Sequence, residues 1–173
     1  QLAADVLNAM NDSDVRVASG MPFSDYVAQT CSARWAVVVS GTFTPTFCIS
    51  EAIQAGALPI FVVGEGTMGG EGLPRLSTSL FTSLGSEMDR ALLDRALMEA
   101  ETKRLETKMP FYDEGVRFSS FGVIISAANV SLIKAALALP PERIEAMQAA
   151  LDYVRERFTP QGTFDYMQRR VST

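Results

Sequence analysis

Histidine is absent from this sequence, and cysteine occurs only twice. Histidine is the side chain that most often changes charge near neutral pH, and it is the commonest metal ligand in proteins. Its absence excludes serine–histidine catalytic pairs and histidine-ligated metal sites, and two cysteines alone cannot complete a zinc site. The sequence therefore predicts no metal centre, and we assign it no catalytic residue.

The two cysteines are Cys31 and Cys48. We expect two buried free thiols, because cysteine is among the residue types most often found in protein interiors. A disulfide between them is the alternative if the compartment is oxidising.

Positive charge is also scarce, with 15 Lys and Arg against 20 Asp and Glu and a net charge of −5. Nucleic-acid binding depends on clustered Lys and Arg, so we expect no nucleic-acid partner. The longest apolar stretches are interrupted by Lys134, by Asn129 or by Pro and Gly, and none is long enough for a membrane span. We therefore predict no transmembrane segment.

What is present is an alternation of helical and strand-like segments over 173 residues, a length typical of one domain. We expect a single α/β domain over residues 1–173. Strands that alternate with helices form parallel sheets through right-handed crossovers. The predicted strands are 14–18, 34–39, 58–63 and 121–126, and the predicted early helices are 2–10, 22–31 and 47–56.

Two further helices follow the last predicted strand, and Pro140–Pro141 separates them. Proline is favoured in the first turn of a helix, so the second helix should begin near Pro141. Its apolar residues recur at spacings of three and four, which predicts a stripe that faces the core. The stripe consists of Ile144, Met147, Leu151, Val154 and Phe158.

Residues 65–108 interrupt the alternation with a Gly-rich loop and a long predicted helix over 86–108. The turns from Glu101 to Lys108 are nearly all polar, so we expect this end to project into solvent, with Glu99 and Lys103 paired at i,i+4. One interpretation is a solvated surface helix, and the other is an arm that binds a protein partner through Leu93 and Leu97. The competing expectation is that the domain itself covers these leucines.

The stretch "FCISEAIQAGALPIFVVGE" (47–65) places a single carboxylate, Glu51, in the first turns of an otherwise apolar helix. Glu51 could cap the helix, face solvent or hold a ligand. Two later stretches are "MPFYDEGVRFSSFGVIIS" (109–126) and "IKAALALPPERIEAMQAALDYVRERF" (133–158). In this order, the three stretches resemble the C-terminal, donor-binding lobe of the exostosin family of glycosyltransferases. In the first stretch, Glu51, Ala52, Gly56 and Pro59 match the family's pattern.

The resemblance implies a single Rossmann-like lobe with a parallel sheet and flanking helices, which is half of a GT-B fold. Residues 65–108, the Gly-rich loop and the long helix, would be an insertion without a counterpart in the family. It implies hexosyl or glucuronosyl transfer from a nucleotide-diphosphate sugar such as a UDP-sugar, without a metal. Gly41, Thr42 and Thr46 would line the phosphate side, and Glu51 would accept hydrogen bonds from the ribose. A GT-B enzyme needs a second, N-terminal lobe, and the family role would place the protein in the Golgi or secretory lumen.

One departure from the family concerns the phosphate. The family carries an arginine three residues before the glutamate, where this chain has Cys48, and no Lys or Arg lies between Trp35 and Gly64. A thiol cannot make the charged, forked hydrogen bonds of a guanidinium. We therefore expect weak or no binding of UDP-sugars and no catalysis by this chain alone. The second hypothesis is a non-catalytic accessory subunit that docks into a larger assembly, in an organelle, through the inserted helix.

Overall fold

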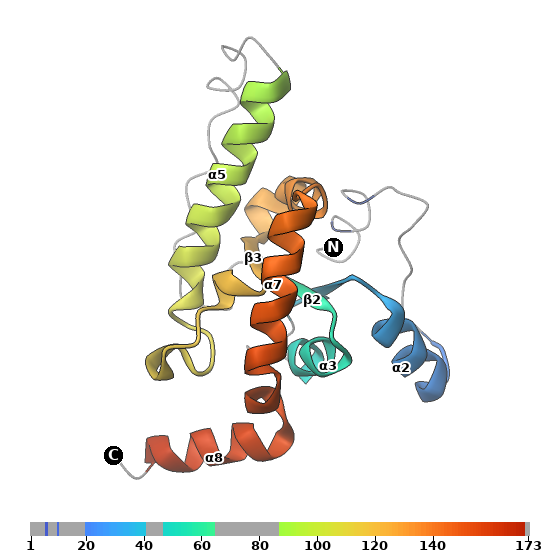
Figure 1. Ribbon diagram of the computed structural model, residues 1–173, viewed down its shortest axis with the longest axis vertical. Coiled ribbons are helices and arrows are strands. Elements are labelled where there is room, and N and C mark those ends of the chain that lie inside the picture. Colours follow the sequence, from blue (N-terminus) through green and yellow to red (C-terminus); the bar gives the residue numbers. More distant parts are fainter. Residues whose placement is uncertain (1–5, 7–9, 11–19, 41–46, 65–86, 172–173) are drawn as a thin grey trace.

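The computed structural model describes residues 6, 10, 20–40, 47–64 and 87–171 (Figure 1). The predicted strand at 14–18, most of the predicted helix at 2–10 and the Gly-rich loop lie outside these residues. The described elements, in chain order, are α2 (Phe23–Ser32), β1 (Trp35–Val39), α3 (Phe47–Ala55), β2 (Leu58–Val63), α5 (Glu87–Glu106), η1 (Tyr112–Glu114), η2 (Phe118–Ser120), β3 (Val123–Ser126), η3 (Ala127–Leu132), α6 (Ile133–Leu137), α7 (Pro141–Val154), η4 (Arg155–Phe158) and α8 (Pro160–Val171).

The described strands form a parallel sheet in the order β1-β2-β3. Val37 is in register with Ile60, and Ile60 with Val123, so all three apolar runs predicted from the sequence pair as expected. Every residue of the central strand β2 is buried, as expected for a parallel strand covered on both faces. The α/β class and the parallel sheet are therefore confirmed.

Helix α3 connects β1 to β2 and ends at Gly56, which has a φ of +83°. This left-handed conformation is the usual termination of a helix, and glycine adopts it without a Cβ penalty. Ile49, Ala52 and Ile53 are buried against the sheet, while Glu51 lies on the exposed side. Helix α3 therefore has one apolar face for the core and one face that a ligand or another element can reach.

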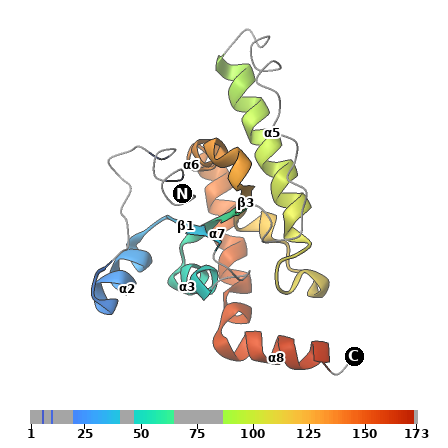
Figure 2. The same cartoon turned by 180° about the vertical axis from the view of Figure 1, so that it is seen from behind.

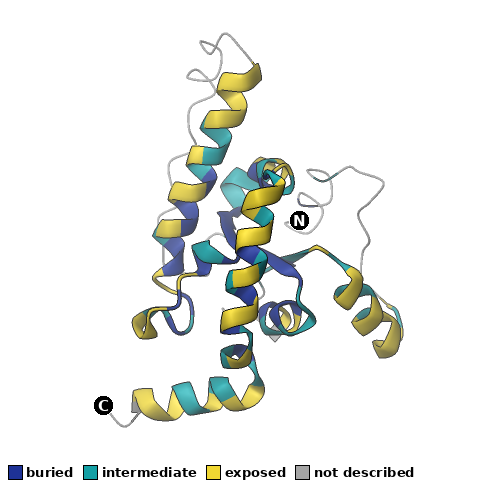
Figure 3. Ribbon diagram, viewed as in Figure 1, coloured by how far each residue is buried: buried dark blue, intermediate teal, exposed yellow. Residues whose placement is uncertain are grey.

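Helix α5 runs along β3, but its orientation relative to the core differs from the sequence prediction. The polar end is the buried one, and the beginning of the helix is exposed (Figure 3). Met98 and Leu105 reach the core together with three polar residues, Glu101, Thr102 and Glu106. The expectation that the polar end projects into solvent was wrong.

Hydrogen bonds explain how these polar residues are buried, because buried polar groups are stable when they have partners. The backbone N–H of Ile124 donates to Thr102 Oγ1 at 3.0 Å, and the Thr102 hydroxyl donates to the Ile124 carbonyl at 3.2 Å. Glu106 Oε2 accepts the Ser119 N–H at 2.9 Å, and Glu101 lies 3.5 Å from Asn129 Nδ2. The Thr102 hydroxyl thus satisfies the N–H and the carbonyl of Ile124 on the side of β3 that faces away from β2.

Helix α7 covers one face of the sheet, in front of it in Figure 1 and behind it in Figure 2. Pro141 occupies its first turn as predicted. Met147, Leu151, Val154 and Phe158 of the predicted stripe are buried, and Ile144 packs against the core. The regular helix ends at Val154 and continues as the 3-10 turn η4, so the predicted apolar stripe is confirmed across this change of geometry.

Helix α8 had no counterpart in the sequence prediction. It packs Tyr166 against Phe111, with ring centroids 4.5 Å apart. Arg170 Nη1 lies 2.6 Å from Asp113 Oδ2, and Arg169 Nη2 lies 2.7 Å from Glu114 Oε1. An aromatic contact and ion pairs therefore attach α8 to the η1 turn.

Both cysteines are free, and both are exposed. The expectation of free thiols is confirmed, but the expectation that they are buried was wrong. Cys31 belongs to α2, none of whose residues is buried, and Cys48 lies on the exposed side of α3. Helix α2 packs beside α3 at the far side of the molecule from α5, so its side chains have few core residues to contact (Figures 1 and 2).

Candidate functional site: the carboxyl edge of the sheet

The carboxyl ends of the three strands lie along one edge of the sheet, where open α/β sheets usually bind ligands. Ser40 follows β1, Gly64 follows β2, and Ser126 ends β3. The Gly64 N–H donates to Ser40 Oγ at 2.6 Å, which ties the first two strand ends together. Ser126 Oγ is buried and has no hydrogen-bond partner among the described residues. This edge thus carries small polar residues and one unused hydroxyl.

Glu51 lies in α3, the helix that follows β1, and its carboxylate is exposed. The Tyr26 hydroxyl on α2 donates a hydrogen bond to Glu51 Oε2 at 2.8 Å. No other hydrogen bond to the Glu51 carboxylate is made within the described part of the chain. Among the described residues, Glu51 therefore makes no capping bond to its helix. Its carboxylate is fixed by Tyr26 and keeps the capacity to accept further hydrogen bonds.

The pKa of Tyr26 is raised to about 12, first by burial and then by the hydrogen bond and the negative charge of Glu51. Cys48 adds a smaller effect of the same sign, which places its thiol near the phenol. At neutral pH Tyr26 therefore keeps its proton and remains a donor to Glu51. Tyr26, Cys48 and Glu51 form one surface cluster, which we call the α2–α3 cluster.

Positive charge is missing from this cluster. No described Lys or Arg makes an ion pair with Glu51. Arg34 lies before β1, where its carbonyl accepts the Leu58 N–H at the amino end of the sheet. The described residues therefore place no positive charge in the cluster.

The residues expected at the sugar-nucleotide and partner sites are located as follows. Gly41, Thr42 and Thr46 lie outside the described residues, whereas Glu51 lies in the α2–α3 cluster. Leu97 packs against the core of this chain, and Leu93 is half-buried. The domain itself thus covers part of the apolar surface that was expected to meet a partner.

Three residues of these sites, Tyr26, Ser40 and Ser126, were not predicted from the sequence. Tyr26 is 25 residues from Glu51, and no pattern in a single sequence links two such positions. Ser40 and Ser126 could have been found, because each is the polar residue at the end of a predicted strand.

The described part of the chain has neither a metal-binding cluster nor a membrane-spanning helix. No group of three or more Cys, Asp or Glu side chains there is arranged to hold a metal ion. None of the described helices combines the length and the apolar character that a membrane crossing requires.

Comparison of the chain with models of protein families, with curated proteins and with solved structures gave no match.

Proposed function

We propose that this chain is the donor-binding lobe of an exostosin-like glycosyltransferase whose phosphate contacts are degenerate. The observation that carries the proposal is the exposed Glu51 carboxylate, which Tyr26 fixes on the helix that follows β1. A carboxylate in this place can accept hydrogen bonds from two adjacent ribose hydroxyls, and such charge-assisted bonds are stronger than neutral ones.

The other proposed contacts to the sugar-nucleotide come from the chain just before the helix that carries Glu51. Gly41, Thr42 and Thr46 belong to the segment between β1 and α3, where backbone N–H groups and hydroxyls can bind a diphosphate. These contacts are uncharged, and Cys48 supplies no compensating positive charge. The isolated chain should therefore bind UDP-sugars weakly or not at all, and the residue that activates the acceptor would come from a second lobe.

The proposal can be tested by restoring the missing charge. Cys48→Arg should strengthen the binding of UDP-glucose or UDP-glucuronate by about 1.5–3 kcal/mol, because hydrogen bonds to charged groups contribute this much. Isothermal titration calorimetry of the wild type and the variant measures the gain.

Two further variants make the test specific. Adding Glu51→Gln to Cys48→Arg should weaken the binding again, whereas adding Glu145→Gln, which changes an exposed residue of α7, should not. Equal affinity of wild type and Cys48→Arg would show that Cys48 does not face a phosphate. Micromolar affinity in the wild type would contradict the proposed degeneracy.

The second candidate is a non-catalytic accessory subunit that docks through α5. It is favoured by the exposed apolar side chains Met88 and Leu92, which are 73% and 59% exposed at the beginning of the helix. Large exposed apolar residues close together on one helix are typical of binding surfaces. The two candidates differ in the residues they need, since only the first depends on Glu51.

A further inference from the structure

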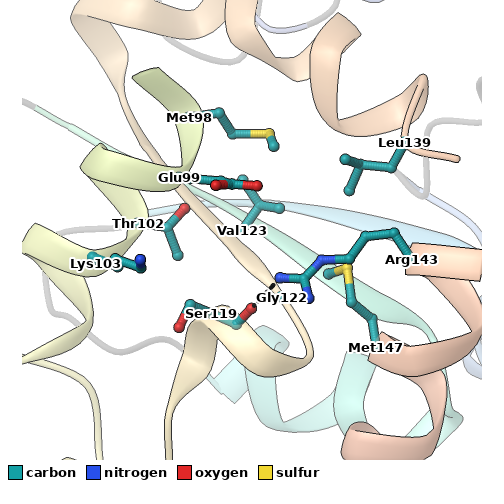
Figure 4. Close-up of a pocket in the computed structure, with 10 residues that line it drawn as sticks. All are labelled: Met98, Glu99, Thr102, Lys103, Ser119, Gly122, Val123, Leu139, Arg143 and Met147. Atoms are coloured by element: carbon teal, nitrogen blue, oxygen red, sulfur yellow. Dashed lines mark hydrogen bonds between the residues drawn. The ribbon is translucent and has the colours of Figure 1, made fainter. Parts of the chain in front are cut away.

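A cleft of about 330 Å³ lies between α5 and α7, next to the first residue of β3 (Figure 4). Its floor is apolar and consists of the buried side chains Met98, Val123, Leu139 and Met147. Sites for small molecules begin at roughly this volume and combine an apolar lining with a few polar groups. Two methionines give the floor an adaptable, polarisable surface.

Two cationic side chains flank this floor. Lys103 lines the cleft from α5, and Arg143 extends toward it from α7, on the opposite wall (Figure 4). Arg143 Nη2 donates to the Ser119 carbonyl at 3.3 Å, which holds the guanidinium at the mouth.

Neither cation makes an ion pair with an acidic residue of the described chain. The expected pair between Glu99 and Lys103 is not formed, and the ion pairs among the described residues include neither Lys103 nor Arg143. Glu99 also lines the cleft, which leaves a net charge of +1 there. The excess of positive charge in the cleft favours a ligand with an acid group.

We propose that the α5–α7 cleft binds a small amphipathic organic acid. Lys103 and Arg143 bind the acid group, and the methionine-lined floor covers the hydrocarbon part. The proposal concerns a different end of the molecule from the α2–α3 cluster and does not depend on the sugar-nucleotide role.

Octanoate is a suitable probe because it has both an acid group and a short hydrocarbon chain. In the full chain labelled with ¹³C at the methionine methyl groups, NMR titration with octanoate should shift the signals of Met98 and Met147. The signals of Met88 and Met167, which are exposed elsewhere, serve as internal references. Octanamide tests the need for charge, and acetate tests the need for the hydrocarbon chain.

Variants then assign the charges. Lys103→Gln and Arg143→Gln should each raise the dissociation constant of octanoate about threefold, and the double variant about tenfold, as expected for solvent-screened charge contacts. Lys134→Gln, which changes an exposed lysine on α6 outside the cleft, should leave it unchanged. Equal binding of octanamide and octanoate, equal binding by the double variant, or shifts that spread to Met88 and Met167 would each overturn the proposal.

Discussion

At the scale of single residues, two hydroxyl groups determine how distant segments meet. Thr102 completes the hydrogen bonding of Ile124 at the edge of the sheet, and Tyr26 holds Glu51 between two helices. The first hydroxyl is buried and the second is partly accessible. Removing the Thr102 hydroxyl should therefore lower the stability of the fold, whereas removing the Tyr26 hydroxyl should change how the protein titrates at alkaline pH.

Thr102→Val should lower the free energy of unfolding by about 1–3 kcal/mol, because it leaves a buried N–H and a buried carbonyl of Ile124 without a partner. Urea unfolding followed by circular dichroism measures this loss. Thr107→Val is the matched control, since Thr107 is exposed on the next turn. Thr102→Ser keeps the hydroxyl and should recover a large part of the stability. If Thr102→Val and Thr107→Val unfold at the same urea concentration, Thr102 does not support the strand.

The raised pKa of Tyr26, about 12 against a usual value of 10.0, predicts a dependence of stability on alkaline pH. A group whose pKa is higher in the folded state stabilises that state below its unfolded pKa, and this contribution is lost as pH rises through the folded pKa. The contribution of Tyr26 is therefore complete below pH 10.0 and is lost toward about pH 12.

Absorbance titration of the four tyrosines near 295 nm tests the raised pKa on which this pH dependence rests. A component with a pKa near 12 should be present in the wild type and absent in Tyr26→Phe. Glu51→Gln should move it to lower pH but not fully to the ordinary value, because burial is the larger cause. Since the pKa of Tyr166 is also raised, Tyr166→Phe is the control and should leave the Tyr26 component in place.

At the scale of elements, the sequence correctly predicted the helices and strands whose burial is determined by their pattern of apolar residues. The run Leu58–Val63 is apolar throughout and became the central strand, and the stripe from Met147 to Phe158 became the inner face of α7. Gly56 marked the end of α3, and Pro141 the start of α7. In each case the local signal and the tertiary position agree, which is why a single sequence was sufficient.

Burial that depends on partners could not be predicted in this way. Glu101, Thr102 and Glu106 are polar, and their burial depends on partners that include Asn129, Ile124 and Ser119. Helix α8 was missed because Pro160 and Gly162 are usual helix breakers, and one aromatic contact and ion pairs attach it to the η1 turn. The α2–α3 cluster likewise requires knowing that two helices are neighbours.

At the scale of the whole molecule, α5 divides into a half that belongs to the core and a half that extends beyond it (Figure 3). Leu105 is buried in the core half, whereas Leu92 is largely exposed in the other half. The same substitution in the two halves should therefore have different effects on stability.

Leu105→Ala should lower the free energy of unfolding by about 2–5 kcal/mol, the usual effect of removing a buried leucine side chain. Leu92→Ala should change it by less than about 0.5 kcal/mol, as surface substitutions usually do. Denaturant unfolding of both variants decides the matter. A large loss in Leu92→Ala would mean that the exposed half of α5 contributes to folding of the domain. No loss in Leu105→Ala would mean that α5 is not part of the core.

The parallel pairing of β2 with β3 also has a consequence for the order in which this chain can fold as it is synthesised. The central strand is paired by Ile60 with Val37 on one side and with Val123 on the other, so its second partner comes roughly 60 residues later, which takes about 3–12 seconds of translation. During that interval, a fully apolar strand has one unpaired edge. Helix α5 is synthesised just before β3 and pairs with it through Thr102, so these two can associate locally and then join β2 together. Until that happens, we expect the unpaired edge of β2 to be the part of the nascent chain most exposed to aggregation.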